Sequence, residues 1–451
     1  MKSVMKNLSV LMGGLALGMF MPKQAKAQSD SVSLNLDKVL EIALSDNPDI
    51  QVANKTIEIQ KYAKKETITG LFPTASVTAA EVKNLKVGTV VMKMPGQEPM
   101  KIQMGRPYNT SLQGTIALPL IVPQLWKSIE LNEEQVKLAV EQARSSKVST
   151  ISQVKKAYYS VLLTRDSYNV LQASYKVAEE SVNNTTKMFE QGLVSEYDKL
   201  SADVQLASLK PQLLQVENGL KLAEMQLKVL MGVDVNEPIK FEGKLSDYES
   251  DLFNELMLLK NDTSLEDNST LKQLDIQRRQ LVLAEKLNKL GYIPTLALQL
   301  GGGYTAMPDH FNPFKTQYFG SSSLTLAFSW NIWDGGAKLM KTHQNKLQLE
   351  NLDTQIENVK RQLELAINSS LNGIETAAEQ VVSTKENVFS AEKAFGISQK
   401  RYEVGSGTML EMNSSETQLL NARLQYVQSI YDFLSNRASL EETLGKVVTN
   451  K

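Results

Sequence analysis

The most regularly spaced acidic residues in this chain follow two glycine-containing turns. Asp198 lies six residues after Gly192, and Glu411 lies six residues after Gly405. Carboxylates gathered at one narrow place attract cations, repel anions and raise each other's pKa. A solvated helix surface explains two such acids equally well. The spacing therefore indicates either a charged constriction or an ordinary helix surface, depending on what the two turns face.

No set of residues has the spacing of a catalytic centre. The chain contains no cysteine, which excludes disulfides, thiol catalysis and thiolate metal sites. Its two histidines, His310 and His343, lie in unrelated contexts, and Gly301-Gly302-Gly303 lacks the lysine of a phosphate-binding loop. We expect no enzyme activity, no cofactor and no metal site. The formal net charge of -1, without a basic cluster, gives no sign of nucleic-acid binding.

The segments that must position the two turns occur twice. The run Gly70-Leu71-Phe72-Pro73-Thr74 is echoed by Gly291-Tyr292-Ile293-Pro294-Thr295, roughly 220 residues later. The residues leading into Gly192 are echoed by those leading into Gly405. Solenoid repeats have periods of roughly 20–50 residues, so this repeat is a duplicated half. Two similar halves predict a pseudo-symmetric chain, and several such chains could close into a ring around an axis.

Each half combines two strands with a long helical hairpin. Residues 124–191 contain neither proline nor glycine, and a continuous helix of that length measures about 100 Å. Such a rod needs coiled-coil partners. The expected fold is therefore mostly α with a small β part. The first half, 28–232, should have strands at about 72–82 and 110–120 and a hairpin at about 124–231. After a connector at 233–268, the second half, 269–451, should have strands at about 292–301 and 323–333 and a hairpin at about 335–444.

The strand at 323–333 has the clearest alternation in the chain. Small and polar residues share one face, and the other is entirely apolar: Leu324, Leu326, Phe328, Trp330 and Ile332. A strand of this length and pattern fits the wall of an outer-membrane barrel. A soluble sheet could alternate in the same way, but four strands leave open edges that lipid does not tolerate. Three chains would close such a sheet.

The start of the chain has the features of a secretory signal. Lys2 and Lys6 precede an apolar run, and Ala25 and Ala27 form an A-x-A cleavage site, so we expect a mature chain from Gln28. A retained membrane anchor is the alternative. The segment 83–106 contains several glycines and prolines and should form an exposed hairpin loop.

Together these features resemble the TolC-like outer membrane efflux protein family. The resemblance lies in the opening pattern of residues 36–48, the two Pro-containing strand starts, Trp333-Asp334-Gly335-Gly336 and Arg401-Tyr402-Glu403-Val404-Gly405. It implies a homotrimer with a twelve-stranded outer-membrane barrel on a periplasmic α-barrel. Such a trimer is the exit duct of a tripartite efflux or type I secretion system in a Gram-negative bacterium. Its partners are a periplasmic adaptor and, indirectly, an inner-membrane transporter.

The resemblance also implies roles for the turns. Asp198 and Glu411 would constrict the pore, although Ser414 and Gly407 replace an acid and a tethering arginine found in relatives. Many relatives are lipidated at a cysteine that this chain lacks, so outer-membrane lipid would contact only the barrel. Adaptor docking would involve both turns: Gly192, Leu193, Val194, Ser195, Gly405, Ser406, Gly407 and Thr408.

The alternative is a periplasmic coiled-coil adaptor or structural binding protein that forms no pore. A soluble adaptor has no need of the apolar stripe at 324–332, and adaptors usually carry one helical hairpin where this chain has two. The sequence does not identify the cargo, because drugs, metal ions and secreted proteins all leave through ducts of this type.

Overall fold

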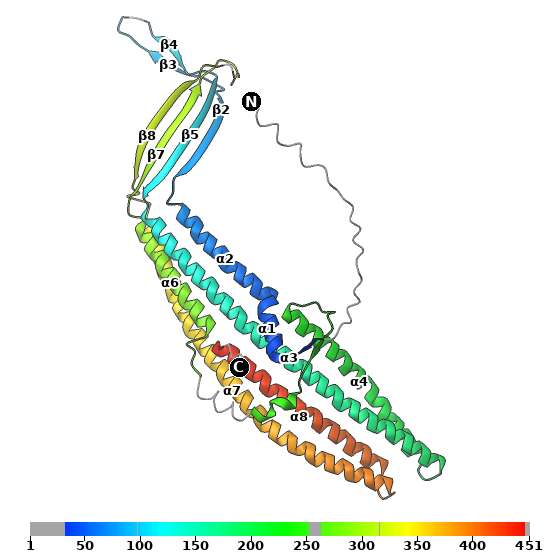
Figure 1. Ribbon diagram of the computed structural model, residues 1–451. Helices are drawn as coiled ribbons and strands as arrows, with labels where there is room; N and C mark the ends of the chain where they lie inside the picture. The colour runs from blue at the N-terminus through cyan, green and yellow to red at the C-terminus, as the bar shows by residue number, and fades with distance from the viewer. Residues whose placement is uncertain (1–31, 97, 252–262, 315, 447–451) are drawn as a thin grey trace, which may run out of the picture.

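The computed structural model describes residues 32–96, 98–251, 263–314 and 316–446. The molecule is elongated, with a sheet at one end and two helical tips at the other (Figure 1). Its first half contains α1 (Leu36–Asp46), α2 (Pro48–Thr69), β2 (Thr74–Lys83), β5 (Tyr108–Ile121), α3 (Pro123–Glu190) and α4 (Glu196–Met231). Its second half contains α6 (Ser269–Leu290), β7 (Thr295–Ala306), β8 (Phe319–Ser329), α7 (Ala337–Glu403) and α8 (Met409–Leu444).

The main sheet has four antiparallel strands in the order β2-β5-β7-β8. The two halves therefore meet between β5 and β7, and β2 and β8 form the edges. Gly303, in the middle of β7, comes so close to β5 that a Cβ atom would overlap the carbonyl oxygen of Leu112. Gly303 therefore permits the close approach of β7 and β5.

The strand predicted at 323–333 is wrong at its end, because β8 stops at Ser329. Ser329 pairs with Thr295, and the next residue along the partner strand is Pro294, which has no N–H to donate. Trp330 and Ile332 therefore lie beyond the strand. Trp330 instead donates its indole N–H to the carbonyl oxygen of Tyr292 at 3.0 Å.

The loop predicted at 83–106 contains a small ribbon of its own. Strand β3 (Gly88–Met92) pairs antiparallel with β4 (Met100–Met104) and leaves the sheet between β2 and β5. Figure 1 shows this ribbon beyond the end of the sheet that lies farthest from the helices.

The long helices run from the sheet to the tips. Helix α3 has 68 residues and α7 has 67, which corresponds to about 100 Å each. Helix α4 returns along α3 and α8 returns along α7, as the repeat predicts (Figure 1). Among the described residues, no helix combines the length and apolar character needed to cross a bilayer.

The largest core lies midway along the molecule, where α1, α3, α4, α7 and α8 meet. The short strands β1 (Val32–Leu34) and β6 (Ile239–Phe241) pair in parallel beside it, and the 3-10 helix η1 (Leu245–Asp251) packs against it. A buried ion pair joins α3 to α8, with Lys155 Nζ 2.6 Å from Glu441 Oε2. This core holds the two hairpins together between the sheet and the tips.

The same helix-end contact occurs once in each half. Asn47 caps the start of α2 and donates its side-chain amide to the carbonyl oxygen of Leu230 at 2.8 Å. Asn268 caps the start of α6 and donates in the same way to the carbonyl oxygen of Thr443 at 2.7 Å. The last turns of α4 and α8 are thereby fixed to the helices that lead to the sheet, so each hairpin is anchored in an equivalent way.

Candidate functional site

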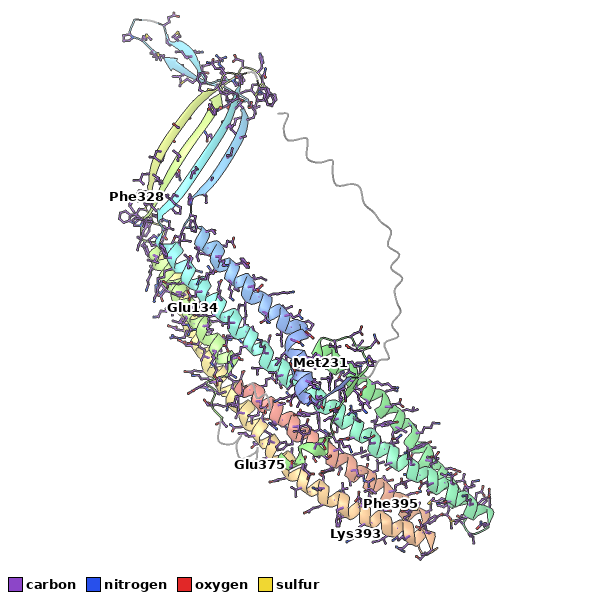
Figure 2. All side chains as sticks on the ribbon, viewed as in Figure 1. Glu134, Met231, Phe328, Glu375, Lys393 and Phe395 are labelled. Atoms are coloured by element: carbon purple, nitrogen blue, oxygen red, sulfur yellow. The ribbon has the colours of Figure 1, made fainter. Side chains whose placement is uncertain are left out.

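One face of the main sheet is apolar and uncovered. The cross-strand rows Ile116–Leu300–Leu324 and Leu118–Leu298–Leu326 lie on this face. Leu324 is 69% exposed, Leu326 62% and Phe328 65%. Figure 2 shows Phe328 at the end of the sheet nearest the helices, and in Figure 1 no helix covers the sheet. The absence of a second layer argues against the soluble-sheet alternative, because a soluble protein would bury such a face.

The opposite face carries small, uncharged side chains. Its central row is Ser76–Thr115–Gly301–Ser323, and the next row contains Gln113 and Ser321. Polar hollows remain between these small groups along β5, β7 and β8. The sheet thus has one apolar and one polar face, which is the division that a barrel wall requires.

Aromatic residues gather where the sheet meets the helices. Tyr292 precedes β7, and its ring lies 4.7 Å from Lys338 Nζ at the start of α7. Trp330, which is hydrogen-bonded to the backbone of Tyr292, is half exposed. Amphipathic rings in this position match the interfacial aromatics of membrane proteins. Trp330 therefore lies at the boundary of the apolar face, rather than within the lipid-facing strand as predicted.

The first tip is a tight turn closed by a capping box. Gly192 has φ +70°, a left-handed conformation that glycine adopts without strain. Ser195 Oγ accepts a hydrogen bond from the Asp198 N–H at 3.2 Å, and Asp198 Oδ2 accepts one from the Ser195 N–H at 3.2 Å. This reciprocal pair satisfies two N–H groups at the start of α4.

The second tip repeats the arrangement. Gly405 has φ +73°, Thr408 caps α8, and Glu411 Oε2 accepts a hydrogen bond from the Thr408 N–H at 3.4 Å. Arg401 lies beside this turn, with Nη1 3.6 Å from Glu411 Oε2 and Nη2 donating to the Ser406 carbonyl oxygen at 3.1 Å. The two acids that the glycine spacing identified are thus both helix-capping residues. The capping-box spacing was visible in the sequence, but the Arg401 contact was missed.

An exposed apolar stripe runs from the first tip along α4. Leu193, Tyr197, Leu200 and Val204 recur at three- or four-residue intervals, and all four are more than half exposed. This is the spacing of a helix face that packs against another helix. This stripe was not predicted, although the spacing of apolar residues within 193–204 indicates it.

Glu416 on α8 is a buried carboxyl group without a partner. Its side chain is 3% exposed, and neither carboxylate oxygen has a hydrogen-bond partner among the described residues. It lies one turn from Met412, which packs near Ala202, and one turn from Leu420, which packs near Leu171. Burial raises the pKa of Glu416 to about 7. Glu416 could not be recognised from the sequence, because its neighbours Ser414, Ser415 and Thr417 are polar and predict an exposed position.

In the described part of the chain, no three side chains of histidine, cysteine, aspartate or glutamate gather as they would around a metal ion. His310 lies in the loop after β7, and His343 lies on α7. The groups with evident physical roles are therefore the two sheet faces and the two tips.

A fold with an uncovered apolar sheet, two matched halves and long paired helices defines a class of outer-membrane channel proteins. The family model described as "Outer membrane efflux protein" matches residues 39–233 and 262–446. The chain belongs to this family, and the two matched segments correspond to the duplicated halves. Membership places the protein in the outer membrane of a Gram-negative bacterium.

Named relatives agree with this assignment. The chain is 23% identical over 331 residues to outer membrane protein TolC of Escherichia coli, covering 71% of this chain and 66% of TolC. It therefore spans slightly less than two thirds of that relative. Over 428 residues it is 20% identical to the probable efflux pump outer membrane protein TtgC of Pseudomonas putida, covering 91% of this chain and 82% of TtgC.

Solved structures share the fold. The Campylobacter jejuni CmeC outer membrane channel superposes with a TM-score of 0.70 at 16% identity, covering 91% of this chain and 85% of CmeC. The open state of the Neisseria gonorrhoeae MtrE outer membrane channel superposes with a TM-score of 0.70 at 16% identity, covering 91% of this chain and 89% of MtrE.

Proposed function

We propose that this protein is the outer-membrane exit duct of a tripartite efflux or type I secretion system. Three copies would close the four-stranded sheets into one barrel, and the helical hairpins would continue the wall into the periplasm. Substrates delivered by an inner-membrane transporter would leave through the water-filled interior. The observation that carries this proposal is the open sheet, whose apolar face is uncovered.

Closure follows from the edges of the sheet. Strands β2 and β8 each present one side without a partner strand in the main sheet. Unpaired N–H and C=O groups in lipid cost several kcal/mol each, so an open edge cannot remain in the membrane. Pairing β8 of one copy with β2 of the next removes every edge and directs the small polar side chains inward.

The test is native mass spectrometry of the protein extracted from the outer membrane in detergent. We expect a trimer of the chain without residues 1–27. A monomer, or recovery from the soluble periplasm alone, would contradict the proposal and favour a coiled-coil adaptor.

The lipid contact can be tested separately on one strand. Leu326→Arg should impair membrane assembly, because an arginine on the lipid face near mid-bilayer costs about 2–4 kcal/mol. Thr325→Arg places the same charge on the opposite face and should still assemble. Equal behaviour of the two variants, measured as heat-resistant trimer in outer-membrane fractions, would contradict the assigned orientation.

We infer that the tips dock a periplasmic adaptor. The exposed residues of the two turns, 192–195 and 405–408, lie at the far end of the molecule from the sheet (Figure 1). The apolar stripe at Leu193, Tyr197, Leu200 and Val204 offers a surface for a helical partner. Tyr197→Ser with Val204→Ser should abolish export while trimers persist. Loss of the trimer would instead assign the stripe to contacts between copies.

We also propose that Asp198 and Glu411 line the narrow end of the duct. In a trimer they would contribute six carboxylates, which attract cations. Asp198→Asn with Glu411→Gln should weaken cation preference in planar-bilayer recordings. Unchanged selectivity would leave the two acids with their capping role alone.

A further inference from the structure

The β3–β4 ribbon is a solvent-exposed structure. Every described residue of both strands is exposed, and the only strand partner of each is the other. An isolated two-stranded hairpin is marginally stable in water. The ribbon therefore gains stability if a further surface covers one of its faces.

One face of the ribbon is apolar. In the antiparallel register, Val90 lies opposite Ile102 and Met92 opposite Met100. Side chains two residues apart along a strand share a face, so Met104 joins them. All five are at least 36% exposed.

The other face is more polar, and the turn between the strands carries both Lys93 and Glu98. Thr89 lies opposite Gln103 and Val91 opposite Lys101, and Lys93 follows directly after β3. Neither lysine forms an ion pair with a described residue. The apolar face and the two lysines are chemically complementary to a surface that has an apolar interior covered by negatively charged groups.

The position of the ribbon indicates which surface this is. It leaves the sheet at the end farthest from the helices, directly after Lys83 and before Tyr108. If the sheet spans the outer membrane, this end emerges at the outer leaflet. The ribbon then starts where the membrane-spanning part of the sheet ends.

We propose that the β3–β4 ribbon lies on the outer leaflet of the membrane as an amphipathic β-hairpin. Val90, Met92, Met100, Ile102 and Met104 insert among the acyl chains, and Lys93 and Lys101 contact the negatively charged headgroups. The ribbon anchors the channel to the lipid surface around the barrel. This inference rests on the proposed function, since it requires the sheet to cross the membrane.

The experiment uses the complete trimer in nanodiscs that contain phosphatidylglycerol. The chain has no cysteine, so one introduced cysteine carries a spin label at a unique position. Three variants are compared: Met100→Cys on the apolar face, Gln103→Cys on the opposite face, and Leu326→Cys on the sheet. Collision rates with oxygen, which partitions into lipid, and with a water-soluble nickel chelate report the environment of each label.

We expect labels at residues 100 and 326 to favour oxygen over nickel, with a ratio several-fold above that at residue 103. Nickel access at 100 equal to that at 103 would mean that the apolar face lies in water, which overturns the proposal. Low access to both reagents at 100 would mean that protein covers the face, which also overturns it. A label at 326 that does not contact lipid would refute the membrane-spanning sheet itself.

The lysine contacts are tested by changing the lipid charge. In zwitterionic nanodiscs the oxygen-to-nickel ratio at residue 100 should fall, while the ratio at 326 stays unchanged. Equal ratios at 100 in both lipids would remove Lys93 and Lys101 from the proposal.

Discussion

Replacing Glu416 with glutamine is expected to remove a pH dependence from the packing of α8 against α3 and α4. The carboxyl group is 3% exposed and lies between two apolar clusters. Burial disfavours the charged form, and no opposing charge or hydrogen bond contributes to the shift. In the packed structure the group therefore holds its proton more tightly than an exposed glutamate does.

The magnitude follows from the two pKa values. The ordinary value is 4.5 and burial raises it to about 7, a difference that corresponds to about 3 kcal/mol. The packed state binds the proton more tightly, so the stabilisation is complete below pH 4.5. It is lost as the pH rises to about 7, and higher pH removes no more of it. The lower hairpins should thus loosen between mildly acidic and neutral pH.

Hydrogen exchange measured by mass spectrometry can detect this loosening locally. In peptides covering residues 409–420, corrected for intrinsic exchange rates, opening should increase about a hundredfold between pH 5 and pH 8. Glu416→Gln should exchange at a pH-independent corrected rate. Glu416→Leu should do the same and should also be better protected, because leucine leaves no unpartnered polar atom in the core.

Glu411→Gln is the matched control, since Glu411 lies on the same helix with an exposed carboxylate. It should retain the full pH dependence of the wild type. Identical pH profiles for the wild type and Glu416→Gln would refute the reasoning. That result would mean that Glu416 is ionised and hydrated in the native protein.

Two further predictions concern stability and are checked by thermal unfolding of the detergent-solubilised protein. Gly445→Ala should destabilise the folded protein by about 1–3 kcal/mol, because residue 445 has φ +70° and the new Cβ atom would overlap the backbone carbonyl of Asp267. Gly396→Ala, in α7 where a Cβ atom meets nothing, should be neutral or stabilising. Lys155→Met should cost about 1.5–3 kcal/mol, because it removes one partner of buried Glu441 while Arg437, with Nε 3.0 Å from Glu441 Oε1, still compensates the charge. Lys127→Met breaks an equally short but exposed pair and should cost no more than about 1 kcal/mol.

The helices could be predicted because the sequence marks their ends with proline and glycine. Pro48 begins α2, Gly192 and Gly405 follow the two longest helices, and no glycine or proline interrupts α3 after its first residue. These signals act locally, so the chain itself determines where such helices begin and end. The duplication then strengthened each assignment, because a segment in one half predicted its counterpart.

The strand ends could not be predicted in the same way. Strand β8 ends at Ser329 because its partner β7 begins after Pro294, and the apolar alternation continues past that point to Ile332. The register between strands that lie far apart in the sequence determines where β8 ends. The alternation of apolar residues within one strand carries no information about that register. The segment 83–106 was predicted as an exposed hairpin loop and is an exposed hairpin, but its glycines and prolines gave no indication of the two short strands β3 and β4 within it.

The acids at the tips cap their helices, and the role proposed for them in the pore would be a second role for the same residues. A capping box at these positions needs an acceptor, and glutamine serves at the third helical position as glutamate does. Capping therefore explains why a polar side chain follows each turn, but it does not require a charge. Both halves nevertheless carry a carboxylate there, and the charge is what a cation-attracting constriction needs. Amide substitutions keep the acceptor and remove the charge, so they separate the two roles at Asp198 and Glu411, and Glu411→Gln removes the exposed ion pair with Arg401 as well.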